Sequence, residues 1–201
     1  MTAQSIPIPR QLVLASTSVY RYELLQRLGL PFTTVKPQVD ETPQAGESPA
    51  ALAQRLAQLK ARAGAALAPP EAVIIGSDQS AELDGQTLSK PGHRERAAAQ
   101  LAQLSGRCVV FHTGLCVYDA RNGHEQLEVI PYRVWFRPLD AAQIQRYLDR
   151  EQPYDCTGAF KSERLGIALC ERFAGDDPTA LIGLPLIRLC RLLEHTGIHV
   201  V

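Results

Sequence analysis

Three short segments of this 201-residue chain, far apart in the sequence, combine small residues with charged ones. They are residues 16–21 (Ser-Thr-Ser-Val-Tyr-Arg), 76–79 (Gly-Ser-Asp-Gln) and 158–163 (Gly-Ala-Phe-Lys-Ser-Glu). The first offers hydroxyls and an arginine, the second a carboxylate, and the third a lysine and another carboxylate. Such groups could hold a polyphosphate and activate a water molecule beside it, so we expect the three segments to form one nucleotide pocket.

The serine segment is a candidate phosphate site. It follows the apolar run at residues 12–15 and precedes a helical pattern, so a strand would deliver free backbone N–H groups to a helix start, where anions bind. Arg21, on the first turn of that helix, points back toward the same place, and Ser16 adds a hydroxyl. The alternative is a serine-rich turn that only caps a helix.

Asp78 is the candidate catalytic residue. It follows the apolar run at residues 73–75, which places it just past the carboxyl end of a buried strand, the usual position of function in α/β sheets. The chain has no Ser/His/Asp order or nucleophile elbow, which favours direct attack by water. We expect a divalent cation, Mg²⁺ or Mn²⁺, to be held by Asp78 with Asp40 and Glu41. The alternatives are a helix cap for Asp78 and an exposed acidic loop for the other two.

Three lysines are candidate phosphate-binding cations because they accompany these motifs: Lys60, Lys90 and Lys161. Taken singly, each is typical of a solvated surface charge. His112 falls in an expected strand, where a neutral, hydrogen-bonded histidine is commoner than a metal ligand. No zinc-binding spacing is present.

Composition excludes several classes of protein. Lys plus Arg number 21 and Asp plus Glu number 21, so no global field would attract nucleic acid or an anionic membrane. Residues 1–10 lack the pattern of a signal peptide, and no apolar run reaches membrane-spanning length. The five cysteines show no metal or redox spacing, so we expect reduced, mostly buried thiols and a cytoplasmic protein.

Hydrophobic periodicity predicts an α/β fold, with strands and helices mixed along the chain. Strands are expected over residues 11–15, 32–35, 72–76, 107–118 and 128–136, with an Asp-Gly hairpin over 81–88. Helices are expected over residues 20–28, 49–67, 93–104, 140–149 and 185–195. No linker divides the chain, so residues 1–201 are expected to form one domain.

The order of these motifs resembles the Maf family of nucleotide pyrophosphatases. The resemblance spans about residues 11–193 and is carried by residues 12–18 with Arg21, 23–25, 39–41, 57–61, 75–79, 90–91, 112–114, 158–160 and 183–186. It implies an ITPase-like fold with an elongated mixed sheet, flanking helices and a cleft between two lobes, often in a homodimer. It also implies metal-assisted cleavage of nucleoside triphosphates to a monophosphate and pyrophosphate.

By the same resemblance, the candidate residues match family positions. Asp78 matches the proton acceptor, and Ser16 and Arg21 match the phosphate-binding loop. The three lysines match the basic lining of the cleft, and Asp40 and Glu41 match its acidic positions.

Three positions are tied to base choice within the family, and here they are Tyr20, Gln79 and Glu163. The set resembles the branch that acts on 7-methyl-GTP, although that branch usually has tryptophan where this chain has Tyr20, and Val19 stands where proline is usual after the second serine. Methylation at N7 makes guanine cationic, and an aromatic face with a carboxylate would favour that cation. The resemblance therefore implies hydrolysis of 7-methyl-GTP, which would clear modified nucleotides from the pool.

Three alternatives stay open at this point. One is a dTTP/UTP pyrophosphatase of the same family. Another is a non-catalytic nucleotide sensor in cell-division control, against which the presence of Asp78 argues. The third is a structural partner protein that binds no nucleotide.

Overall fold

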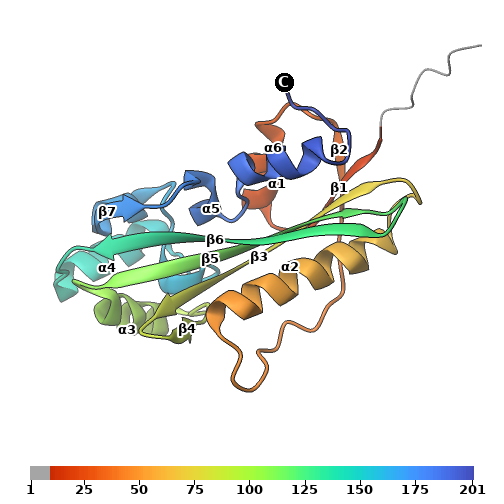
Figure 1. Ribbon diagram of the computed structural model, residues 1–201. Coiled ribbons are helices and arrows are strands. Elements are labelled where there is room, and N and C mark those ends of the chain that lie inside the picture. The colour runs from red at the N-terminus through yellow and green to blue at the C-terminus, as the bar shows by residue number, and fades with distance from the viewer. Residues whose placement is uncertain (1–9) are drawn as a thin grey trace, which may run out of the picture.

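A computed structural model of the chain describes residues 10–201 (Figure 1). The expectation for residues 1–10 therefore lies outside the described residues, Arg10 excepted. Within the described part, seven strands form one sheet: β1 (Leu12–Ala15), β2 (Phe32–Val35), β3 (Val73–Leu83), β4 (Gln86–Leu88), β5 (Cys108–Asp119), β6 (His124–Phe136) and β7 (Cys170–Ala174). The helices are α1 (Val19–Gln26), α2 (Pro49–Ala65), α3 (Arg94–Leu104), α4 (Ala141–Glu151), α5 (Pro178–Ile182) and α6 (Leu186–Glu194), with 3-10 turns η1 (Thr157–Ala159) and η2 (Leu165–Leu169).

The sheet is mixed, as the sequence analysis expects. Its strand order is β2-β1-β3-β5-β6-β7, with β4 paired to β3. β1 runs parallel to β2 and β3, whereas every later pairing is antiparallel. β3, β5 and β6 run the length of the molecule and give it an elongated shape (Figure 1).

Helices cover both faces of the sheet. α2 packs against one face, with Ala57 and Ala61 on the inward side chains of Val13 and Ile74. On the opposite face α1, α5 and α6 cover the alternate residues of the same strands. A third apolar cluster surrounds α3 and α4 at the other end of β3, β5 and β6. The first two clusters lie on the two faces of the sheet in one lobe, and the third is the core of the other lobe. The strands β3, β5 and β6 continue through both lobes.

The predicted elements and their signals are largely confirmed. β2 has the expected bounds, and Asp84-Gly85 forms the turn between β3 and β4. Ser48 caps α2 ahead of Pro49, and Asp140 forms a capping box at the start of α4. β7 and α5 were not expected, because five residues are too few for a clear periodic pattern.

The expected end of the third strand is wrong. We expected a strand over residues 72–76 with Asp78 beyond it, but β3 continues to Leu83. The parallel partner β1 pairs with β3 only as far as Ile75, whereas antiparallel β5 pairs with it as far as Glu82. Asp78 therefore lies inside β3, just past the carboxyl end of the neighbouring β1.

Glycines allow α2 to lie unusually close to the sheet. A Cβ on Gly76 would overlap the carbonyl oxygen of Ala57 and lie 2.5 Å from the backbone nitrogen of Ala61. A Cβ on Gly114, in the adjacent strand, would overlap the carbonyl of Ala53. Both obstacles are backbone, which no change of rotamer can move. The distance between α2 and the sheet therefore depends on these two glycines.

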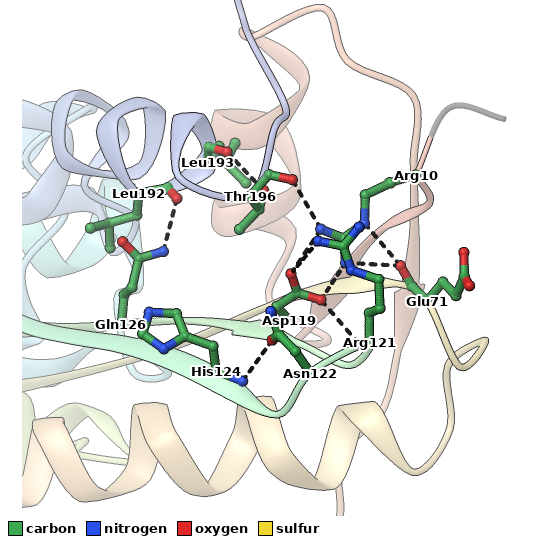
Figure 2. A network of polar contacts seen from close by, with 10 residues as sticks. All are labelled: Arg10, Glu71, Asp119, Arg121, Asn122, His124, Gln126, Leu192, Leu193 and Thr196. Atoms are coloured by element: carbon green, nitrogen blue, oxygen red, sulfur yellow. Dashed lines mark hydrogen bonds and ion pairs between the residues drawn. The ribbon is translucent and has the colours of Figure 1, made fainter. Parts of the chain in front are cut away.

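A network of polar contacts connects both ends of the described chain to the end of the sheet at which β5 turns into β6 (Figure 2). Arg10 donates to both carboxylate oxygens of Asp119, the last residue of β5, and to the carbonyl oxygens of Glu71 and Thr196. Asp119 also accepts from the backbone N–H of Arg121 in the turn that follows. Because Asp119 is buried, its charge needs these partners.

Two further expectations concern the whole chain. Among residues 10–201, no helix combines the length and the apolar character needed to cross a membrane. All five cysteines are free thiols, but only Cys116 is buried, so the expectation of mostly buried thiols is wrong. The other four are half-buried.

We predict that Gly76→Ala lowers the free energy of unfolding by about 1–3 kcal/mol, because the added methyl group forces α2 away from β3. Urea denaturation would measure this. Thr34→Ala, at an exposed position of β2, is the control and should change the value by less than about 0.5 kcal/mol. Equal midpoints for Gly76→Ala and wild type would contradict the packing argument.

Candidate active site

A cavity of about 570 Å³ lies between the two lobes. Its lining includes residues of all three segments singled out in the sequence: residues 16–21, residues 78–79 and residues 162–163. Of the predicted site residues, it brings together Ser16, Tyr20, Arg21, Glu41, Lys60, Asp78, Gln79, Lys90 and Glu163. Asp40 and Lys161 are not among the lining residues.

The serine segment forms a capped helix start that faces the cavity. The hydroxyl of Ser16 accepts from the backbone N–H of Ser18 (3.1 Å), and the hydroxyl of Ser18 accepts from the N–H of Arg21 (3.4 Å). The expected turn and helix cap are therefore both present. Unlike a simple capping turn, this one opens onto a cavity that is also lined by several cationic side chains.

Arg21 is fixed by the loop after α5. Its Nε donates to the carbonyl oxygen of Gly183 (2.9 Å), which also accepts from the hydroxyl of Ser77 (2.9 Å). Burial lowers the pKa of the guanidinium, and the nearby carboxylates of Asp78 and Glu41 oppose that effect. The guanidinium is thus held in place beside the two carboxylates that face the cavity.

Lys60 joins the catalytic candidate to the acidic loop. Its ammonium lies 2.5 Å from Oδ1 of Asp78 and 2.7 Å from Oε1 of Glu41. Lys60 is 8% exposed and Asp78 is 9% exposed, so this ion pair is buried. Burial opposes the charge of Glu41, but the hydrogen bond and charge of Lys60 outweigh it, and its pKa lies below the usual value. α2, which carries Lys60, therefore positions both carboxylates.

The acidic loop contributes less than the sequence analysis expects. Asp40 is exposed, and its carboxylate turns back to accept from the N–H of Thr42 (2.9 Å), so it does not reach the cavity. Within residues 10–201, no group of three or more His, Cys, Asp or Glu side chains could hold a metal ion. Glu41 and Asp78 remain as a pair of carboxylates. Such a pair fits a Mg²⁺ ion that takes its other ligands from substrate phosphates and water.

Gln79 is held by the carboxyl end of α5. Its amide nitrogen donates to the carbonyl oxygens of Ala180 (2.9 Å) and Leu181 (3.0 Å) and lies 3.0 Å from the hydroxyl of Thr113. These contacts commit the amide nitrogen to protein acceptors. The amide oxygen is the group that Gln79 retains for a ligand, and it can only accept hydrogen bonds.

The side chain of Lys161 contacts two residues of the cavity wall, Tyr20 and Asp155. Its ammonium lies 5.9 Å from the ring centroid of Tyr20 and 3.5 Å from Oδ1 of Asp155. Its backbone N–H donates to the hydroxyl of Tyr147 (3.3 Å). Contrary to expectation, Lys161 is not among the residues that line the cavity, but it contacts two that are, Tyr20 and Asp155.

Several cavity residues were missed by the sequence analysis. Lys36 follows β2, which is the parallel neighbour of β1, so both carboxyl ends open onto the cavity. Asp155 and Cys156 precede the third segment and also line the cavity. The ring of Phe111, with its centroid 6.1 Å from that of Phe160 in the predicted third segment, completes an apolar wall. Lys36 could have been found from its place at a strand end, but the aromatic wall depends on contacts between distant segments.

Asp177 was also missed, and it fixes the loop that contacts Arg21 and Gln79. Its carboxylate accepts from the backbone N–H of Thr179 (3.0 Å) at the start of α5 and from that of Ile187 (2.8 Å) at the start of α6. One buried carboxylate therefore caps two helices. The Asp-Pro pair at residues 177–178 is a helix-start signal that could have revealed it.

His112 agrees with the structural role expected for it. Its Nε2 lies 2.7 Å from a carboxylate oxygen of Glu82, which belongs to the neighbouring strand β3. His112 is not among the residues that line the cavity.

The family model described as Maf-like protein matches residues 11–196, nearly the whole chain. The chain belongs to the Maf family. Its relatives include a protein from Albidiferax ferrireducens, 53% identical over 98% of both chains, and one from Polaromonas sp., 56% identical over 96% of this chain and 87% of the relative. A third, from Nitrosococcus oceani, is 54% identical over 95% of this chain and 96% of the relative. All three are named 7-methyl-GTP pyrophosphatase.

Among solved structures, the chain is similar to a nucleoside-triphosphatase, described as a dITP/XTP pyrophosphatase, from Mycobacterium abscessus. The TM-score is 0.40 at 19% identity, over 63% of this chain and 74% of that chain.

We predict that Lys36→Gln weakens binding of inorganic tripolyphosphate about fivefold, as expected for the loss of one exposed cation from a polyanion site. Lys36 forms no ion pair with any residue in the part of the chain described, so its charge is available to a ligand. Isothermal titration calorimetry would measure the change. Arg27→Gln removes one exposed charge outside the cavity and should leave the affinity within twofold; equal losses for both variants would contradict a local role.

Proposed function

We propose that this protein hydrolyses 7-methyl-GTP to 7-methyl-GMP and pyrophosphate. The observation that carries the proposal is the shared cavity. It is lined by the Lys60–Asp78 ion pair, by the capped serine turn, and by the rings of Tyr20 and Phe160 with the carboxylates of Asp155 and Glu163. The names of the relatives, 53–56% identical over nearly the full chain, support the same reaction.

The triphosphate would lie on the start of α1. Backbone N–H groups and hydroxyls of the serine segment would bind phosphate oxygens, and Arg21, Lys36 and Lys90 would balance their charge. Arg21 is already held by Gly183, so little of its freedom is lost when a ligand binds. The cavity thus favours a ligand with several negative charges at one end.

Asp78 would act on the attacking water. Oδ1 of Asp78 is bonded to Lys60, which leaves Oδ2 to accept a hydrogen bond from a water molecule in the cavity. As the oxygen of this water molecule forms a bond to the α-phosphorus, Asp78 accepts one of the water's protons. The bond between the α-phosphorus and the bridging oxygen breaks, and pyrophosphate leaves with that oxygen.

A divalent cation would be held by Glu41 and Asp78 together with substrate oxygens. When bound, it would offset the negative charge that develops on the leaving pyrophosphate. Lys60, which contacts both carboxylates, keeps them at a fixed separation and limits their mutual repulsion before any cation arrives.

The base would lie at the end of the cavity that is lined by aromatic rings and by Glu163. Tyr20 and Phe160 offer ring faces, and the carboxylate of Glu163 accepts hydrogen bonds. Gln79 adds a second acceptor, because its amide nitrogen is committed to α5. Guanine presents N–H donors at N1 and N2, whereas thymine and uracil present one donor between two carbonyl oxygens. The acceptors therefore favour the purine over the pyrimidines of the alternative reading.

We infer that the reaction takes place in the cytoplasm, where nucleotides are made and free cysteines stay reduced. A homodimer remains the expectation that the family resemblance raised.

We predict that Asp78→Asn lowers kcat for pyrophosphate release from 7-methyl-GTP by at least about 100-fold, because asparagine cannot take a proton from water. A coupled pyrophosphate assay would measure the rate, and nucleotide products would be identified by chromatography. Asp176→Asn, at an exposed position, is the control and should keep full activity. Near-zero activity in both wild type and Asp78→Asn would favour a nucleotide sensor, and failure of wild type to bind any nucleotide would favour a structural protein.

We predict that Glu163→Gln lowers kcat/KM for 7-methyl-GTP about fivefold but changes that for UTP less than twofold, because the carboxylate interacts with the cationic purine. A panel of 7-methyl-GTP, GTP, dTTP, UTP and CTP under one metal condition would measure both values. Glu171→Gln, an exposed residue of β7, is the matched control. Equal effects of Glu163→Gln on the purine and the pyrimidine would contradict its role in selecting the base.

A further inference from the structure

The charges of the cavity are divided between two groups of residues. One group is joined by ion pairs around Lys60, and Arg21 lies beside its two carboxylates. With Lys36 and Lys90 it contains more cations than carboxylates. The other group consists of Asp155 and Glu163, which line the cavity with Tyr20, and of Lys161, which contacts Tyr20 and Asp155. In this second group the carboxylates outnumber the cations, although the protein as a whole has no net charge.

Lys161 is the only cation of the second group within the described residues, and it lies next to the ring against which the base is proposed to bind. Its ammonium lies beside the hydroxyl of Tyr20, 5.9 Å from the centroid of that ring, and so at the edge of the surface on which a base would stack. An uncompensated ammonium here would repel a base that carries a positive charge.

Asp155 lies in position to compensate that charge. Its Oδ1 is 3.5 Å from the Lys161 ammonium, and the residue also lines the cavity. Burial opposes the charge of Asp155, but the charge of Lys161, together with hydrogen bonds from the backbone, Cys156 and Lys161, outweighs it, so the pKa of the carboxyl lies below its usual value. Neither sequence motifs nor the proposed reaction assigns a role to this residue.

We propose that Asp155 is a specificity-determining residue: by balancing Lys161 beside Tyr20, it leaves the base end of the cavity net negative and selects a cationic purine over its neutral counterpart. The inference rests on the proposed function, because it concerns the choice between 7-methyl-GTP and GTP at the same site. The polarity of the cavity then matches that of the substrate, which has a cationic base at one end and a polyanion at the other.

The test compares kcat/KM for 7-methyl-GTP with that for GTP. Asp155→Asn keeps the size of the side chain and removes its charge, so the ratio should fall about two- to fivefold, as expected for a carboxylate 67% exposed. Lys161→Gln should shift the ratio in the opposite direction. The double variant should return it close to the wild-type value, because both charges of the pair are then absent.

Two further measurements separate an electrostatic role from a structural one. The difference between wild type and Asp155→Asn should shrink at high salt, which screens exposed charges but leaves packing unchanged. Asp149→Asn is the matched control, since Asp149 is 60% exposed, pairs with Arg94 at 2.7 Å and lies outside the cavity. It should leave the ratio unchanged.

Equal losses for both substrates in Asp155→Asn, or shifts in the same direction for Asp155→Asn and Lys161→Gln, would overturn the inference. Binding of 7-methyl-GMP and GMP, measured by calorimetry, tests the same preference without catalysis. If wild type hydrolyses 7-methyl-GTP and Asp155→Asn leaves both ratios unaltered, only this inference fails. If wild type does not hydrolyse 7-methyl-GTP, the proposed function fails, and the ratio of monophosphate affinities still decides the role of Asp155.

Discussion

The buried contact of Lys60 with Asp78 and Glu41 is the interaction on which the site depends. Lys60 and Asp78 are removed from most of the water, and their charges are stable there because each meets an opposite one, while the more exposed Glu41 adds a second carboxylate to the lysine. The contact in turn requires α2 to lie close to β3, which Gly76 and Gly114 permit. Backbone packing and active-site electrostatics are therefore one constraint in this protein, and neither can change without the other.

Much of the fold could be predicted from the sequence because its elements carry local signals. The Ser48-Pro49 helix start, the Asp84-Gly85 turn and the apolar run at residues 73–75 each reflect chemistry within a few residues, and each is present in the structure. The end of β3 could not be predicted in this way. Its continuation past Asp78 depends on pairing with β5, whose partner residues lie 28 to 34 positions further along the chain.

The candidate site divides along the same line. Ser16, Arg21 and Asp78 belong to motifs whose chemistry is local, and the structure brings them to one cavity. Asp40 and Lys161 have the residue types expected for the lining of the site, but Asp40 turns back to Thr42, and Lys161 reaches the cavity only through its contacts with Tyr20 and Asp155. Residue type gives the chemistry that a side chain could perform, but its neighbours decide where it is directed.

The three long strands that join the lobes have a consequence for motion. β3, β5 and β6 pass from one lobe to the other as hydrogen-bonded, unbroken strands, so the described chain has no hinge about which the lobes could swing together over a ligand. Adjustment to a substrate must then come from the segments that reach over the cavity from its sides, residues 36–47 and 153–164. Entry and release of a nucleotide would then call first for movement of these two segments, since rotation of one lobe against the other would have to bend three paired strands.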